Sequence, residues 1–391
     1  MVADPGSREV GPRSGISGKG QHPSPRAFFY PESCHPVSRR QVLIGAGTLL
    51  AFGAVGRRFA GAGDDGAAII RQWATRPDDP WVVCHGVRAM GRDFSVKGGK
   101  RAVDWLLETH LASLPANGTS ALAFPLAVEV HPNMFLKTLL EAGVPLDHAF
   151  THEGRRRTVS ELVDGARALF RPSEVIGQPN MLPWSLITFA RTTSPLRGRW
   201  TNAWGEPVDL ALVFDSSLRL MEEASLPLMQ AMREGRRETV KAPVHGFTCG
   251  GAHMLYGLLT GAWAGYADQD RAERVRRQLD LMVWRLSADQ GLIERFYRER
   301  ANQPGSYWYE SDAKLKLLGH GEECIAFATH RGVAKLTAAQ QQQRAAAVST
   351  LGRIIEDMEG RNLEEPLRLD QYLFAQIVGD TCHARHGLTL T

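Results

Sequence analysis

Several common catalytic motifs are missing from this chain of 391 residues. It has no Walker phosphate-binding loop, no glycine-rich dinucleotide motif after a strand, and no GxSxG, HExxH, CxxCH or CxxC sequence. These absences exclude the usual nucleotide-binding enzymes, serine hydrolases, HExxH metalloproteases and c-type cytochromes, because each class depends on the local geometry of its motif.

Long apolar segments are also missing, apart from one uncharged run at residues 42–56. That run is shorter than the roughly 20 apolar residues that a membrane span needs. Arg39 and Arg40 stand just before it, and Ala60 and Ala62 follow it at the spacing that a signal peptidase reads. We expect cleavage after Ala62 and a mature protein without a stable membrane anchor.

The segment around the paired arginines, Ser38-Arg39-Arg40-Gln41-Val42-Leu43, resembles a twin-arginine (Tat) signal peptide. The resemblance implies export by the twin-arginine translocase, processing by signal peptidase, and a periplasmic or extracellular location. Residues 1–37 are rich in proline, glycine and serine, so we expect residues 1–62 to be a disordered region followed by the signal peptide. The alternative is a chance Arg-Arg pair in front of a buried helix.

A strong net charge is missing once the leader is removed. Residues 1–62 hold eight of the 46 Lys and Arg but only three of the 42 Asp and Glu. The remaining 329 residues carry 38 basic and 39 acidic side chains, a net charge of −1. The mature protein therefore lacks the net positive charge that would attract a nucleic acid, and we expect no nucleic-acid partner. The length suits one large domain or two small ones with a well-formed core, and we expect the mature protein to be soluble because no later segment is long and apolar enough to span a bilayer.

Apolar residues recur every three or four positions along the mature chain, with glycine and proline marking the turns, and this pattern predicts an all-α protein. No period-two strand pair competes with it. The expected helices cover residues 65–75, 80–91, 99–113, 132–142, 159–169, 182–192, 209–233, 249–266, 271–300, 311–329, 338–359 and 371–384.

Two kinds of predicted helix alternate along the chain. Segments rich in Gly, Ala, Cys and His suit a crowded inner layer, whereas charged amphipathic segments suit a solvated outer layer. The alternation is similar to that of α/α toroids, the fold of terpenoid cyclases, several polysaccharide lyases and lanthionine cyclases. An irregular helical bundle is the alternative. We expect residues 63–391 to form a single helical domain with an irregular Pro/Trp-rich insert at about 171–207.

Cysteine is scarce, and the few cysteines present are paired with histidines in the sequence. In three places a cysteine and a histidine are four positions apart. Each pair can therefore share one helical face and offer two ligands to zinc or a similar divalent metal. The candidate ligands are Cys249, His253, His320, Cys324, Cys382 and His386. The alternatives are ordinary core packing, a Cys249–Cys382 disulfide or a reactive thiol.

Candidate acid–base groups lie beside these pairs. Glu322 and Glu323 follow His320 closely, and the Cys84-His85-Gly86 segment resembles the zinc-binding Cys-His-Gly of lanthionine cyclases. His85, His320, Glu322 and Glu323 are therefore the predicted catalytic residues of a hydrolase or lyase that acts on a glycan-like envelope substrate. The alternative is a non-catalytic helical protein that binds a partner or is purely structural.

Overall fold

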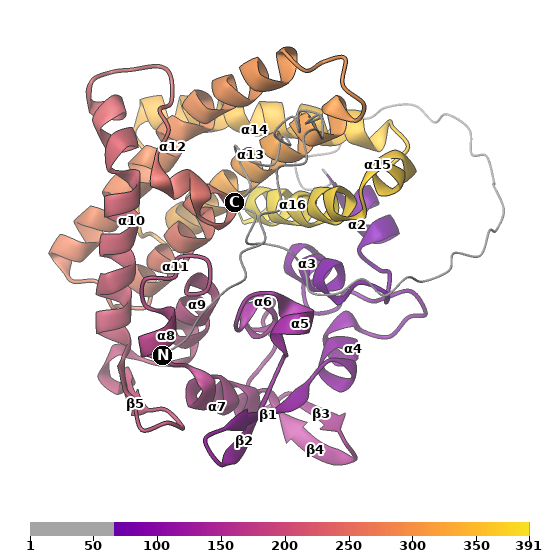
Figure 1. The fold of residues 1–391 in the computed structure, drawn as a ribbon, viewed down its shortest axis with the longest axis vertical. Coiled ribbons are helices and arrows are strands. Elements are labelled where there is room, and N and C mark those ends of the chain that lie inside the picture. The colour runs from indigo at the N-terminus through magenta and orange to yellow at the C-terminus, as the bar shows by residue number, and fades with distance from the viewer. Residues whose placement is uncertain (1–65, 391) are drawn as a thin grey trace, which may run out of the picture.

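A computed structural model describes residues 66–390 of the chain. The predicted signal residues Arg39, Arg40, Ala60 and Ala62 lie outside the described residues. The described part is mainly helical, which confirms the predicted all-α character (Figure 1). None of its helices combines the length and the apolar composition that a membrane crossing requires.

The helices follow the predicted order closely, and their bounds are listed here with the labels of Figure 1. They are α2 (Ala67–Trp73), α3 (Pro80–Met90), α4 (Ala102–Thr109), α5 (Leu126–Glu129), α6 (Met134–Glu141), α7 (Val159–Leu169), α8 (Pro172–Val175), α9 (Pro183–Thr192), α10 (Leu210–Arg233), α11 (Ala252–Trp263), α12 (Gln269–Arg298), α13 (Ser306–His330), α14 (Ala338–Glu359), α15 (Glu364–Leu369) and α16 (Gln371–Thr389). Short 3-10 turns, η1 (Pro195–Arg197), η2 (Pro243–Gly246) and η3 (Thr248–Gly251), complete the set.

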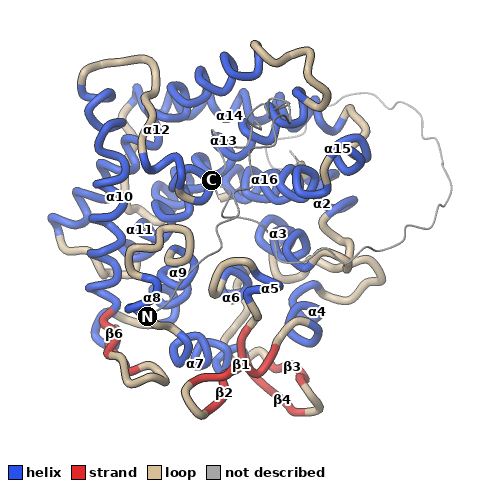
Figure 2. The backbone as a smooth tube through the Cα atoms, viewed as in Figure 1, coloured by secondary structure: helices blue, strands red, loops and turns tan. Residues whose placement is uncertain are grey.

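Three short antiparallel hairpins interrupt the helices, although no strand pair was expected (Figure 2). They pair β1 (Ala112–Ala116) with β2 (Thr119–Ala123), β3 (Ala149–His152) with β4 (Arg155–Thr158), and β5 (Arg199–Thr201) with β6 (Pro207–Asp209). Strands of three to five residues are too short to give a clear period-two signal. Two of the turns contain consecutive residues with positive φ, as tight hairpins require.

Helix boundaries follow from local capping. The Asp79 side chain accepts the N–H of Val82, and Pro80 occupies the first turn of α3, where its missing N–H costs nothing. Thr337 and Gln340 form a reciprocal capping box at the start of α14. The expected bounds of α14, residues 338–359, therefore agree with the structure.

Six helices with mostly buried side chains pack in succession around the middle of the molecule. The contacts run from α3 to α6, α9, α11, α13 and α16, and α16 packs in turn against α3. The closest of these pairs is α13 with α16, where a Cβ on Gly387 would lie 2.8 Å from the backbone nitrogen of Glu323. The charged helices α10, α12 and α14 pack on the outside of this group (Figure 1).

Candidate metal centre

A pocket of about 300 Å³ lies among α3, α6, α9, α11, α13 and α16. Its wall combines imidazoles, cations and aromatic rings, which is the mixture expected of a small-molecule site. The histidines are His85, His131, His253, His320 and His383; the cations are Arg88, Lys137 and Lys316; the rings are Trp81, Trp184, Phe247 and Tyr372. Cys249, Asp79 and Asp380 also line it.

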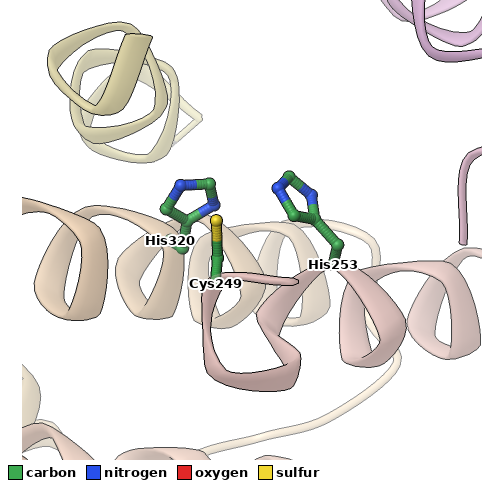
Figure 3. Close-up of side chains that lie close together, drawn as sticks. All are labelled: Cys249, His253 and His320. Carbon is green, nitrogen blue, oxygen red and sulfur yellow. The ribbon is translucent and has the colours of Figure 1, made fainter. Parts of the chain in front are cut away.

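Three side chains of types that can ligate a metal meet at this pocket from three different elements. The ligand atoms of Cys249, His253 and His320 all lie within 4.8 Å of one another. Figure 3 shows the Cys249 sulfur beside the His320 ring, with the His253 ring facing both. Donors around a tetrahedral zinc ion are separated by about 3.5 Å, given metal–ligand distances near 2.0–2.3 Å. The observed cluster can therefore close on an ion with small side-chain movements.

Cys249 reaches the pocket because its backbone is left-handed. Its φ is 50°, and Gly250 and Gly251 follow at 62° and 85°. A cysteine at positive φ is strained, and such strain persists only where the surroundings fix it. Arg285 does so here, since its Nη1 donates to the Gly250 carbonyl at 2.7 Å while its Nε donates to Asp289. The turn ends where α11 begins, at Ala252 rather than at the predicted residue 249.

His253 occupies the first turn of α11 and is buried, with 8% of its surface exposed. Its ring centroid lies 4.7 Å from that of His320 and 5.3 Å from that of His383, and no hydrogen bond to either ring nitrogen is found within residues 66–390. Burial and the neighbouring His320, His383 and Lys137 hold the pKa of His253 well below its usual range. The ring is therefore neutral, as a metal ligand must be.

The carboxylate of Asp380 orients the His320 ring. Its Nε2 donates to Asp380 Oδ1 at 3.0 Å, and Lys316 Nζ lies 3.4 Å from the other Asp380 oxygen. This leaves Nδ1 for the cluster, in the arrangement that orients many metal-ligating histidines. Burial opposes protonation, but the nearby Cys249 and Asp380 raise the pKa of His320 to about 10. A bound cation would displace that proton.

Two further histidines present one nitrogen to the pocket in the same way. His383 donates through Nδ1 to Glu323 Oε2 at 2.9 Å, and its ring lies 3.8 Å from that of His320. His85 donates through Nδ1 to the Trp81 carbonyl at 2.7 Å. Burial lowers the pKa of His85 to about 4 and holds that of His383 well below its usual range. In both rings Nε2 is left to accept a proton or a metal.

Glu323 lies behind His383 and does not itself line the pocket. Arg88 donates to it through Nε at 2.5 Å, and His386 donates through Nδ1 at 2.7 Å. The same arginine pairs with Glu141, which also binds Lys137 at 2.7 Å. Burial opposes ionisation, but Arg88 and His383 hold the pKa of Glu323 well below its usual range. The carboxylate is therefore charged and fixes the position of His383.

The other predicted site residues lie away from the cluster. Glu322 is buried outside the pocket and pairs with Arg344 on α14. Cys324 is buried and donates to the Ala252 carbonyl at 3.3 Å. Cys382 is fully buried, and His386 binds Glu323, so neither lines the pocket. All four described cysteines are free thiols, which leaves the Cys249–Cys382 disulfide unformed.

Sequence reasoning missed Asp380, His383 and Lys137. Asp380, His383 and His386 recur every three residues along one helix, and this spacing offered a signal for a polar face in an otherwise apolar segment. Lys137 gave no such signal, because a single lysine in an amphipathic helix normally faces solvent. Only the packing of α6 against α3 and α9 places it in the pocket.

The left-handed turn yields a first prediction. Replacing Gly251 by Ala should lower stability by about 1–3 kcal/mol, because the new Cβ would sit at φ 85° and 2.6 Å from Val244 Cγ2. Urea unfolding measures the loss. The control is Gly291→Ala, inside α12, where a Cβ meets nothing closer than 3.8 Å and helix propensity favours alanine. An equal loss in both variants would contradict this account of the turn.

Comparison with known proteins offers no guide to the activity. No protein-family model matches the chain, and no curated protein or solved structure is significantly similar to it. The functional conclusion therefore depends on the chemistry of the pocket.

Proposed function

We propose that the mature protein is an exported metal-dependent enzyme, a hydrolase or lyase that acts on a small glycan-like substrate of the cell envelope. The observation that supports this most strongly is the convergence of Cys249, His253 and His320 on one pocket. One sulfur and two imidazoles suit zinc or a similar borderline-soft divalent ion.

Three protein donors beside a cavity favour a catalytic over a structural ion. Structural zinc sites are closed by four protein ligands, whereas catalytic sites keep one position for water or substrate. When bound, such an ion lowers the pKa of a coordinated water and polarises a substrate oxygen. The pocket of about 300 Å³ offers the space for that ligand.

The chain's own groups supply the remaining functions. His383 and His85 each keep one nitrogen for proton transfer, and both rings are held in place by hydrogen bonds on the other side. Trp81 and Trp184 line the cavity and offer flat apolar faces of the kind that sugar rings contact. Glu322 and Glu323 lie outside the pocket, so a pair of glutamates acting across a cleft is not part of the proposed mechanism.

An α/α toroid is our proposal for how the helices enclose this pocket. The succession of contacts from α3 through α6, α9, α11 and α13 to α16 and back to α3 supports it. So does the alternation of these helices along the chain with the outer helices α4, α7, α10, α12 and α14. Export by the twin-arginine translocase, proposed from the leader, suits a protein that folds around an ion before it crosses the membrane.

Elemental analysis of the purified exported protein tests the proposal. We expect about one zinc or similar ion per chain, its loss in His253→Ala, and glycan cleavage that stops on chelation and returns with metal. A bound ion without turnover of any glycan or glycoside tested would support the non-catalytic alternative with a structural metal. A protein purified without metal, and unable to take up zinc, would contradict the proposal.

A second candidate function uses the same atoms without a metal. Cys249, His320 and Asp380 form a chain of thiol, imidazole and carboxylate, which is the arrangement of a cysteine nucleophile with its base and orienting group. In that case iodoacetamide should modify Cys249 rapidly and stop an activity that chelators leave intact. Slow labelling in the metal-loaded protein, and rapid labelling only after chelation, would favour the metal centre.

A further inference from the structure

We infer that the substrate of this pocket carries a carboxylate, which the ammonium group of Lys137 binds at the inner wall. This inference rests on the proposed function, because it names the substrate class of the same site. Lys137 belongs to α6, lines the pocket and has 2% of its surface exposed. A lysine buried this deeply is uncommon, since removing its charge from water is costly.

The described residues give the Lys137 ammonium fewer partners than it has N–H groups. Its three N–H groups have two described neighbours, the Glu141 carboxylate at 2.7 Å and the face of the Tyr256 ring, whose centroid is 5.5 Å away. Glu141 is shared with Arg88, so Lys137 does not hold this carboxylate alone. N–H donors of Lys137 are therefore left for a ligand in the cavity.

Lys316, the other lysine of the pocket, differs in this respect. Its Nζ donates to Gln376 Oε1 at 2.5 Å and lies 3.4 Å from Asp380 and 3.8 Å from Asp312. Lys316 thus donates one hydrogen bond and lies beside two carboxylates, one of which belongs to Asp380 behind His320. Of these two lysines, Lys137 is the one with capacity to bind an anion.

The position of Lys137 relative to the cluster suits a carboxylate-bearing substrate. Lys137 and His253 line the same pocket, and the Lys137 ammonium lies over the ring of Tyr256, which follows His253 by about one turn of α11. An ion pair in a buried cavity is stronger than one in water, and a charged hydrogen bond adds direction to it. A carboxylate held there would orient the rest of a small substrate toward Cys249, His253 and His320.

Calorimetric titration of the zinc-loaded exported protein with acetate tests this inference. Acetamide, which has the same shape without the charge, serves as the matched probe. We expect acetate to bind and Lys137→Met to weaken it at least about 10-fold, with acetamide binding and zinc content unchanged. The control Lys314→Met removes a lysine that pairs with Glu310 outside the pocket and should leave acetate binding intact.

Each outcome separates the subsite from the metal centre. If both proteins take up zinc, and acetate binds Lys137→Met as tightly as it binds the original protein, the carboxylate subsite is overturned and the metal centre stands. Acetate binding that depends on Lys137 in a protein unable to take up zinc supports the subsite and contradicts the metal centre. Should Lys137→Met fail to fold, the double variant Lys137→Met with Glu141→Gln removes both charges and gives the same readout.

Discussion

Replacing Cys249 by Ser should abolish stoichiometric zinc binding while the protein stays folded. Cys249 supplies the sulfur of the three-donor cluster, and a hydroxyl is a much poorer ligand for a borderline-soft ion. Loss of a residue that only hydrogen-bonds to a metal ligand typically costs 10–100-fold in metal affinity, so we expect loss of a direct ligand to cost more than about 100-fold. Competition with a chromophoric chelator measures the affinity.

Cys324→Ser is the matched control for this experiment. Cys324 is also buried on the inner helices, but its thiol donates to the Ala252 carbonyl, a contact that a serine hydroxyl can keep. We expect zinc affinity in this variant to stay within a few-fold of the original protein. A larger loss of zinc affinity in Cys324→Ser than in Cys249→Ser would show that Cys324, and not Cys249, is the zinc ligand.

Replacing Arg88 by Met should produce the largest loss of stability. Arg88 is the cation that pairs with both Glu141 and Glu323, and all three side chains are almost fully buried. Removing one partner from a buried ionic network leaves uncompensated charge, which typically costs about 3–5 kcal/mol. Urea unfolding of the purified variant measures the free energy of unfolding.

An exposed ion pair provides the comparison. Arg101 pairs with Asp104 at 2.7 Å, but half of its side chain is exposed. Arg101→Met should therefore cost less than about 1 kcal/mol. Similar losses in Arg88→Met and Arg101→Met would show that the network around Glu323 contributes little, and would remove the physical reason for the fixed position of His383.

The helical pattern of the chain was predictable because its signals are local. The capping box of Thr337 and Gln340 marks the start of α14, and proline marks the first turns of α3 and α9. The start of α11 was placed three residues too early. The sequence Cys249-Gly250-Gly251 carries a helical spacing to His253, yet its left-handed turn puts Cys249 outside the helix.

The candidate site was predictable only in part, because its members come from helices distant in sequence. His320 and Cys324 share the spacing that suggested a common ligand face, but only His320 reaches the pocket. Asp380 and His383 join the site through the close packing of α16 on α13, which depends on Gly387. Such convergence depends on three-dimensional packing and has no local signature in a single sequence.

X-ray absorption at the zinc edge of the metal-loaded protein tests the central claim most directly. The structure predicts a first shell with one sulfur at about 2.3 Å and at least two imidazole nitrogens at about 2.0 Å. His253→Ala should reduce the imidazole contribution, and Cys249→Ser should remove the sulfur. A shell composed only of oxygen and nitrogen in the original protein, or one with two or more sulfurs, would contradict a centre formed by Cys249, His253 and His320.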